Sequence, residues 1–207
     1  MSEKKLKVTV FSDYICPFCY IGFYRVEQLK KKYDLEVEWL PFEIHPETPK
    51  EGTELKNLPF PKDYLDMMKA NIKKLADDVG ISLKLSDKLP NSRLALYLSE
   101  FARKNGKFEV FHKLVFDSYW MDGKDIGDQA FLLDLADTIG LKRNEILDYI
   151  SSEEPKSELT KSLKDLRQYG INGVPTFIIG DKIVVGAQPY EVFMKVIENA
   201  LQNEAVI

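Results

Sequence analysis

The chain has 207 residues, of which 44% are hydrophobic and 30% are charged, an ordinary composition for a globular protein. Its formal net charge is −4 and it has no block of basic residues, so we expect no nucleic-acid partner. No apolar stretch is long enough to span a bilayer, and the first residues lack an export signal. We therefore expect no membrane association and a cytoplasmic location.

The first predicted element is a strand over residues 6–12, where β-branched side chains roughly alternate with polar ones. Residues 18–29 have helical periodicity, and Pro17 suits a first helical turn because its missing N–H costs nothing there. The only two cysteines, Cys16 and Cys19, fall at this junction. Because a helix N-terminus carries partial positive charge, it favours a thiolate and lowers a cysteine pKa from about 8.5 to about 3.5–7.5.

The elements that follow are predicted from the positions of proline and glycine and from the spacing of apolar residues. A second alternating strand over residues 35–42 suggests a parallel pair with the first. Residues 43–61 are too rich in proline and glycine for regular structure, and a loop of this length is often functional. Residues 62–169 read as several short helices that end at glycines. A hairpin follows over residues 176–185, and a last amphipathic helix opens at Pro189.

This order of elements predicts the α/β class, with a thioredoxin-like fold that carries a large helical insertion. Residues 1–61 and 170–207 would form the thioredoxin-like domain, and residues 62–169 the inserted helical subdomain. The middle segment is expected to be an insertion rather than an independent unit, because the chain must return to complete the first sheet.

Two structural interpretations of the cysteine pair compete with redox chemistry. Half of a zinc site would need two more ligands, but the chain has only two histidines and no second cysteine pair, so we expect no metal. A structural disulfide across so short a loop would add little stability, since the entropic gain grows with loop length. In the cytoplasm a Cys-x-x-Cys pair is more often catalytic than structural, so redox function is favoured.

The segment Val174-Pro175-Thr176 just before the third strand predicts the second half of the site. In thioredoxin-like folds a proline here has a cis peptide bond and packs beside the cysteines, leaving the backbone of Val174 free to pair with an extended substrate. A trans proline that starts a strand is the simpler alternative. We expect substrate contacts at Val174, Thr176, Pro17, Phe18 and Tyr14.

Further polar and aromatic residues lie near the motif in the sequence. The aromatic side chains around it could form an apolar docking patch or ordinary core, and the sequence favours neither. Asp13 is expected to cap the turn rather than to accept a proton from Cys19. His45 is expected to be exposed in its loop, and His112 to lie at a helix surface. We assign neither histidine a chemical role.

Several segments together resemble the FrnE-like branch of the DsbA family, a likeness that covers nearly the whole chain. They are residues 11–22 (FSDYICPFCYIG), 41–46 (PFEIHP), 173–177 (GVPTF) and 186–189 (GAQP), with residues 91–92 and 125–128 in the helical block. The resemblance implies a thioredoxin fold and thiol–disulfide oxidoreductase chemistry. It also implies that Cys16 is the attacking cysteine, Cys19 the resolving cysteine and Pro175 a cis proline. Because Cys19 lies one helical turn further in, we expect Cys16 to be the exposed member of the pair and Cys19 the more buried one.

The resemblance favours disulfide exchange with protein or small-molecule thiols through the Cys-Pro-Phe-Cys pair. The same superfamily holds kappa-class glutathione transferases and 2-hydroxychromene-2-carboxylate isomerases, which typically have serine at the first position. A glutathione-dependent transferase or isomerase is therefore the alternative, and a non-redox binding module is a second. No bound cofactor is expected, with glutathione a candidate co-substrate. The sequence leaves monomer and homodimer open.

One position departs from the pattern of the periplasmic oxidants, which have histidine directly before the second cysteine. Here that position is Phe18, and a neutral ring cannot stabilise a nearby thiolate by charge. We therefore predict a reduction potential below the about −120 mV of the DsbA prototype, in the range of about −180 to −230 mV.

Overall fold

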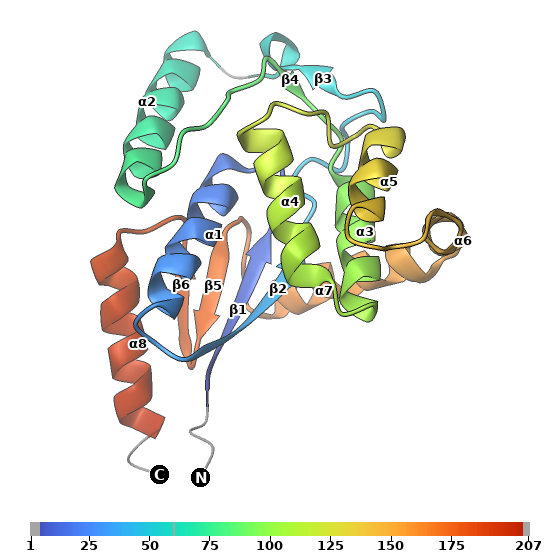
Figure 1. Ribbon diagram of the computed structural model, residues 1–207. Coiled ribbons are helices and arrows are strands. Elements are labelled where there is room, and N and C mark those ends of the chain that lie inside the picture. Colours follow the sequence, from blue (N-terminus) through green and yellow to red (C-terminus); the bar gives the residue numbers. More distant parts are fainter. Residues whose placement is uncertain (1–4, 60, 205–207) are drawn as a thin grey trace.

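A computed structural model describes residues 5–59 and 61–204, apart from the side chains of residues 165, 167 and 168. The parts of the sequence predictions that fall on residues 1–4, 60 and 205–207 lie outside the described residues. Within the described ranges, no helix combines the length and the apolar character needed to cross a membrane. Figure 1 shows a central sheet with helices on both faces and a group of helices beside it.

The elements follow the predicted order, with a strand–helix–strand start and a hairpin–helix end. They are β1 (Leu6–Ser12), α1 (Pro17–Lys30), β2 (Leu35–Pro41), β3 (Thr53–Glu54), a 3-10 turn (Leu55–Asn57), α2 (Lys62–Val79), β4 (Lys88–Leu89), α3 (Arg93–Lys104), α4 (Phe108–Trp120), α5 (Gln129–Asp137), α6 (Arg143–Ser151), α7 (Glu154–Gln168), β5 (Thr176–Ile179), β6 (Lys182–Val185) and α8 (Tyr190–Glu204).

The central sheet has the strand order β2-β1-β5-β6 in the part of the chain that the structure describes. β1 pairs in parallel with β2, with Val10 opposite Trp39, and antiparallel with β5, with Val10 opposite Phe177. β5 and β6 form the predicted antiparallel hairpin. The fold expected from the sequence, α/β and thioredoxin-like with a helical insertion, is confirmed. The exact division at residues 62 and 169 stays a proposal.

Alternation along β1 directs its side chains to two cores on opposite faces of the sheet. Val8 and Val10 join the large core that includes α1 and α8, whereas Phe11 packs against Leu166 of α7 and Ile171. Figure 1 shows α1 and α8 on one face and α7 on the other. Because both faces are covered at the end of β1, the turn that follows it is held from both sides.

The long loop after β2 contains regular structure that the sequence analysis missed. Residues 43–61 were expected to be irregular, but β3 lies within them and pairs with β4 in a two-stranded antiparallel ribbon. Each of these strands has two residues, too few for an alternating pattern to show. The last helix also begins at Tyr190 rather than Pro189, and β2 ends at Pro41 rather than residue 42.

Candidate active site

Cys16 caps the N-terminus of α1 at the point where β1 has just ended. Its backbone is extended, and Pro17 takes the first helical position, as the sequence predicts. The Cys16 carbonyl accepts the amide hydrogens of Cys19 and Tyr20, at 3.0 and 3.3 Å. The side chain of Cys16 is therefore held at the positive end of the helix dipole, where a sulfur anion is electrostatically favoured.

The second half of the site is the turn before β5, which lies against the first half. The Val174–Pro175 peptide bond is cis, as predicted. Cys16 Sγ lies 3.6 Å from the Val174 carbonyl oxygen and donates a weak hydrogen bond to it. Gly22 permits the close approach, because a Cβ there would lie 3.0 Å from Phe177 Cζ and 3.5 Å from Pro175 Cγ. The predicted juxtaposition of the cysteine motif and Pro175 is thus present.

The two sulfurs differ little in exposure, contrary to one expectation. Cys19 is fully buried, as predicted, but Cys16 is also buried, with 4% of its surface exposed. The expectation that Cys16 would be the exposed member is therefore wrong for this conformation, since the Val174 carbonyl and the surrounding core cover it. A reagent therefore reaches Cys16 only if the segment around Val174 shifts, or if the reagent is narrow enough to pass that segment.

The environment of Cys19 favours the neutral thiol. Burial raises the pKa of the Cys19 thiol well above its usual value, and the neighbouring Cys16 thiol raises that pKa further. The main-chain amide of Asp13 and the side chain of Ser12 act on the Cys19 pKa in the opposite direction. These two groups belong to the last residue of β1 and to the residue that follows it.

Asp13 fastens the turn that carries the cysteines, as the sequence analysis expected. Its carboxylate accepts the Ile15 amide at 3.3 Å and the Ile44 amide at 2.8 Å, which ties the turn to the start of the long loop. Burial raises the pKa of Asp13 to about 6, and the Ile44 amide, Ser92 and the Ile15 amide offset only part of that rise. Ser92 lies beside this carboxylate but outside hydrogen-bonding geometry, since its oxygen has no partner among the described residues.

Of the five residues expected to contact substrate, the structure keeps three accessible. Pro17, Phe18 and Val174 are partly exposed. Tyr14 is 2% exposed and belongs to the core, so its expected docking role is wrong. Thr176 is fully buried, its hydroxyl donates to the Gly173 carbonyl at 2.7 Å and it pairs with both neighbouring strands, so it presents no surface to a substrate in this structure.

His112 occupies a place that the sequence analysis did not foresee. The expectation of a helix surface is wrong, because His112 is 4% exposed and its Nδ1 lies 2.8 Å from the Tyr14 hydroxyl. Burial lowers the pKa of His112 well below its usual value, and the positive charges of Arg103 and Lys30 lower that pKa further. The signal was present, since position 112 lies on the apolar stripe of α4 between Phe108 and Phe116.

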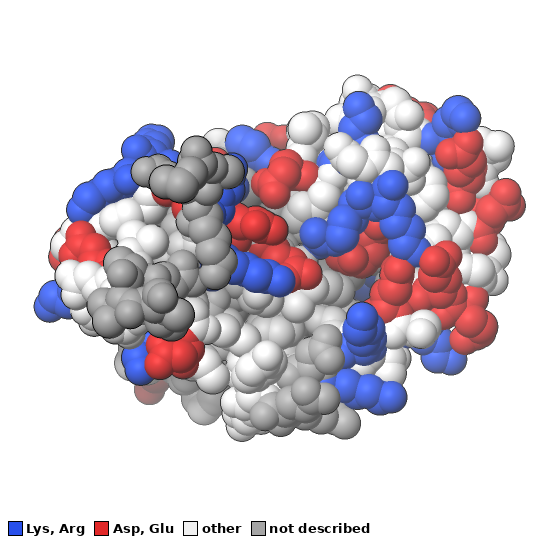
Figure 2. Space-filling view, turned by 90° about the horizontal axis from the view of Figure 1, so that it is seen from below, with Lys and Arg blue, Asp and Glu red and all other residues white. Residues whose placement is uncertain are grey.

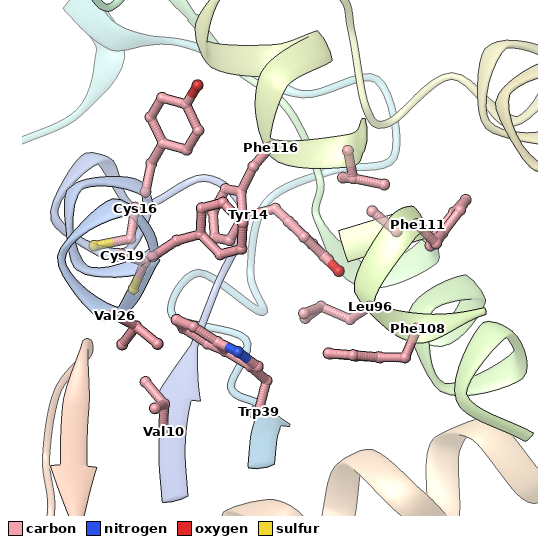
Figure 3. Close-up of a cluster of buried hydrophobic side chains, with 14 of the residues drawn as sticks. Val10, Tyr14, Cys16, Cys19, Val26, Trp39, Leu96, Phe108, Phe111 and Phe116 are labelled. Carbon is pink, nitrogen blue, oxygen red and sulfur yellow. The ribbon is translucent and has the colours of Figure 1, made fainter. Parts of the chain in front are cut away.

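An aromatic cluster joins this histidine to the cysteine turn. Figure 3 shows Tyr14 beside Phe116, with Trp39 and Phe108 nearby and the two sulfurs at the edge of the cluster. The Tyr14 and Phe116 rings meet edge to face, with centroids 4.9 Å apart. The aromatic residues around the motif are therefore mainly core. Of the two alternatives that the sequence left open, a docking patch or ordinary core, Tyr14 belongs to the core.

The loop after β2 is held near the site by an ion pair that the sequence did not reveal. Arg93 Nη2 lies 3.0 Å from Glu43 Oε1, and Arg93 also donates to the Pro46 carbonyl at 2.9 Å. His45 pairs instead with Glu47, at 2.9 Å, and takes no part in the site. The first residues of the loop therefore flank the cysteine turn through Asp13 and Arg93.

The surface seen in Figure 2 mixes lysine and arginine with aspartate and glutamate, without a broad basic area on that face. Among residues 5–59 and 61–204, no group of three or more histidine, cysteine, aspartate or glutamate side chains is placed to hold a metal ion. The cysteine pair and its polar neighbours are therefore the chemistry-bearing cluster that the structure presents at this end of the sheet.

Two curated proteins align with almost the entire chain. The chain is 32% identical over 195 residues to the "Uncharacterized protein YwbO" of Bacillus subtilis, and the alignment covers 93% of this chain and 96% of that protein. It is 22% identical over 182 residues to the 2-hydroxychromene-2-carboxylate isomerase of Sphingobium xenophagum, which covers 86% of this chain and 91% of the isomerase.

Solved structures share the fold at lower identity. A probable DsbA oxidoreductase from Streptomyces coelicolor superposes with a TM-score of 0.84 at 24% identity, covering 95% of this chain and 90% of that one. A 2-hydroxychromene-2-carboxylate isomerase superposes with a TM-score of 0.81 at 18% identity, covering 97% of this chain and 98% of the isomerase. The cytosolic disulfide reductase DsbM from Pseudomonas aeruginosa, solved with GSH, superposes with a TM-score of 0.65 at 18% identity, covering 92% and 98%.

At these identities the structural likeness shows the fold alone, and assignment to the FrnE-like branch stays a prediction. The family comparison goes further, because residues 7–198 match the family described as "DSBA-like thioredoxin domain". The match includes the Cys16–Cys19 motif, the Val174–Pro175 turn and, apart from Leu6 at the start of β1, the four strands of the central sheet. The chain therefore belongs to the DSBA-like thioredoxin domain family.

Proposed function

We propose that this protein is a thiol–disulfide oxidoreductase that uses Cys16 and Cys19 as its redox pair. The observation that carries the proposal is the position of Cys16, which caps α1 and contacts the Val174 carbonyl across the sheet end. A helix N-terminus stabilises a thiolate, and Val174 is a partly exposed residue, which supports pairing of its main chain with an extended substrate. The family assignment supports the same chemistry.

The exchange takes place in two balanced steps. In the oxidised protein, a substrate thiolate attacks Cys16 Sγ, the Cys16–Cys19 bond breaks, and its electron pair leaves on Cys19 Sγ. A second substrate thiolate then attacks the substrate sulfur of the mixed disulfide and releases Cys16. In the reverse direction, the Cys16 thiolate attacks a substrate disulfide and Cys19, after losing its proton, resolves the product. Protein or small-molecule thiols and disulfides serve as partners, without a bound cofactor.

The experiment compares Cys19→Ser with its matched control Cys16→Ser after exposure to glutathione disulfide, with intact-protein mass spectrometry as the readout. Cys19→Ser should accumulate one glutathione adduct at Cys16, because the resolving thiol is missing. Cys16→Ser should accumulate little adduct, because Cys19 is fully buried and its pKa is raised. Equal adduct on both variants, or adduct on Cys16→Ser alone, would refute the assigned roles.

A second candidate is a glutathione-dependent isomerase or transferase that acts on a small aromatic compound. The specific observation in its favour is the similarity to 2-hydroxychromene-2-carboxylate isomerases in both sequence and fold. Such turnover would require glutathione and would survive Cys19→Ser, whereas disulfide exchange would not complete in that variant. The presence of two cysteines favours the oxidoreductase.

We also propose a cytoplasmic location for this activity. The chain has no cysteine outside the redox motif, as expected for a compartment in which structural disulfides are rare. Rapid acid quenching of cells followed by thiol alkylation would report the resting state of the pair. A cytoplasmic protein should be recovered mainly reduced, whereas a fully oxidised population would point to an oxidising compartment.

A further inference from the structure

A small cavity lies between the end of the sheet and helices α3 and α4, and the proposed function makes no use of the residues around it. Its volume is about 10 Å³, close to the smallest space that holds one water molecule. Ser12, Trp39 and His112 line it, together with Tyr14, Leu96 and Phe108. Figure 3 shows Tyr14 and Trp39 facing Leu96 of α3 and Phe108 of α4.

Three of the residues that line this cavity each carry a buried polar atom without a protein partner. Ser12 Oγ, Trp39 Nε1 and His112 Nε2 are each inaccessible and make no hydrogen bond to any described residue. Their side chains belong to residues that are 4%, 2% and 4% exposed. A buried polar group left unpaired costs about 1–3 kcal/mol, so three around one cavity indicate a shared polar ligand rather than chance.

The chemistry of the three atoms selects that ligand. The Trp39 indole can only donate, and the His112 ring donates from Nε2 when its Nδ1 accepts the Tyr14 hydroxyl at 2.8 Å. A hydroxyl such as Ser12 Oγ can accept and donate at once. Water has two acceptor and two donor positions, so it can accept from Trp39 and His112 and donate to Ser12.

We propose that this cavity binds one water molecule, and that the water orients the Ser12 hydroxyl toward the sulfur of Cys19. This role of Ser12 rests on the proposed redox function, whereas the water site does not. The Ser12 side chain acts on the Cys19 thiol in the direction that favours its charged form, and the Ser12 oxygen makes no hydrogen bond to any described residue, Cys19 included, so its hydroxyl is free to be oriented. Because the water donates to a lone pair of the Ser12 oxygen, the hydroxyl hydrogen is directed toward Cys19 Sγ.

The contact matters when Cys19 carries charge, which happens in the step that breaks the Cys16–Cys19 bond. The electron pair of that bond moves onto Cys19 Sγ, and the Ser12 hydroxyl donates a hydrogen bond to it without transferring its proton. Trp39 and His112 are positioning residues, because they act on the sulfur only through the water and Ser12. The same stabilisation serves the reverse step, in which the Cys19 thiolate attacks.

The water site is tested by NMR on the wild-type protein, with an internal control. Trp39 and Trp120 are the only tryptophans, and the Trp120 indole donates to the Tyr14 carbonyl at 2.8 Å. We expect a magnetisation-transfer cross-peak from a long-lived water to the Trp39 indole hydrogen and none to that of Trp120. We also expect the nitrogen shifts of His112 to report the tautomer protonated at Nε2. Absence of the Trp39 cross-peak would overturn the water site.

The role of Ser12 is tested by the rate at which glutathione opens the Cys16–Cys19 disulfide of the oxidised protein. Ser12→Ala should slow that step and its reverse by about tenfold each, the effect of losing one hydrogen bond to a charged sulfur, with the midpoint potential unchanged. Ser99→Ala is the matched control, because Ser99 lines the same cavity but donates to the Leu96 carbonyl at 2.8 Å. It should react at the wild-type rate.

The outcomes separate the parts of the proposal. Equal rates for Ser12→Ala and Ser99→Ala, or a shift in potential without a change in rate, would overturn the role of Ser12. A wild-type protein that forms no disulfide would refute the redox function and the role of Ser12 with it, while the Trp39 cross-peak would still decide the water site. The cross-peak is measured on the wild-type protein, so the water site can still be refuted if Ser12→Ala fails to fold.

Discussion

The buried carboxyl group of Asp13 gives the stability of this protein a pH dependence that can be calculated. Burial raises the pKa of Asp13 from 3.8 to about 6. Between these values the native state keeps a proton that the unfolded chain releases, so the free energy of unfolding falls as the pH rises through this window. At about 1.36 kcal/mol for each pKa unit, Asp13 costs about 3 kcal/mol of stability at neutral pH.

The perturbation is Asp13→Asn, which removes the titration while keeping the shape of the side chain. Urea unfolding of both proteins should be followed by circular dichroism between about pH 7.5 and about pH 4.5. Over this range the wild type should gain about 2 kcal/mol relative to the variant, because most of the cost is recovered before the lower pKa is reached. Other titrating groups cancel in the difference.

The absolute stability of Asp13→Asn at one pH does not test this reasoning, since the amide also loses one of the two main-chain hydrogen bonds, to Ile15 or Ile44. The pH dependence of the difference does. Parallel profiles for the two proteins, or a difference that grows toward alkaline pH, would refute the assignment of a raised pKa to Asp13.

Further predictions address His112, the core and the redox potential. Because burial holds the pKa of His112 low, the unfolded chain takes up a proton at acidic pH that the native state does not. The wild type should therefore lose stability relative to His112→Asn as the pH falls through about 6.5. A stability difference between the two proteins that stays constant with pH would contradict this. Phe116→Ala should cost about 3–5 kcal/mol in urea unfolding, since Phe116 is fully buried among aromatic rings, and a loss below about 1 kcal/mol would count against the core described for α4. Phe18→His should make the reduction potential less negative, because the added positive charge stabilises the nucleophilic thiolate; each ~1.4 kcal/mol of such stabilisation corresponds to about 30 mV. A glutathione titration in which the two proteins agree would refute that reasoning.

Local patterns were sufficient to predict the framework of the fold. The alternation in residues 6–12 and 35–42 and the Pro17 helix start gave β1, α1 and β2 to within a residue. The glycine at position 180 gave the hairpin of β5 and β6. These signals suffice because each depends on neighbours within one strand, turn or helix. The two-residue ribbon of β3 and β4 was missed because it pairs residues far apart in the sequence.

The site could be predicted only as far as its motifs. Cys16, Cys19 and Pro175 lie together as expected, but the burial of Cys16 depends on how closely the Val174 segment packs, which no local pattern encodes. The Tyr14–His112 hydrogen bond joins residues 98 positions apart. A lone histidine in a helix gives no sign of its partner, although its place on the apolar stripe of α4 could have indicated burial.

The central claim is that Cys16 and Cys19 form a reversible disulfide. The direct measurement equilibrates the wild-type protein in glutathione buffers of defined potential, quenches it with acid, and determines the protein mass. We predict an intramolecular disulfide, seen as the loss of two hydrogens, with a midpoint of about −180 to −230 mV. A protein that keeps both thiols, or gains only a glutathione adduct, in the most oxidising buffer would contradict the account.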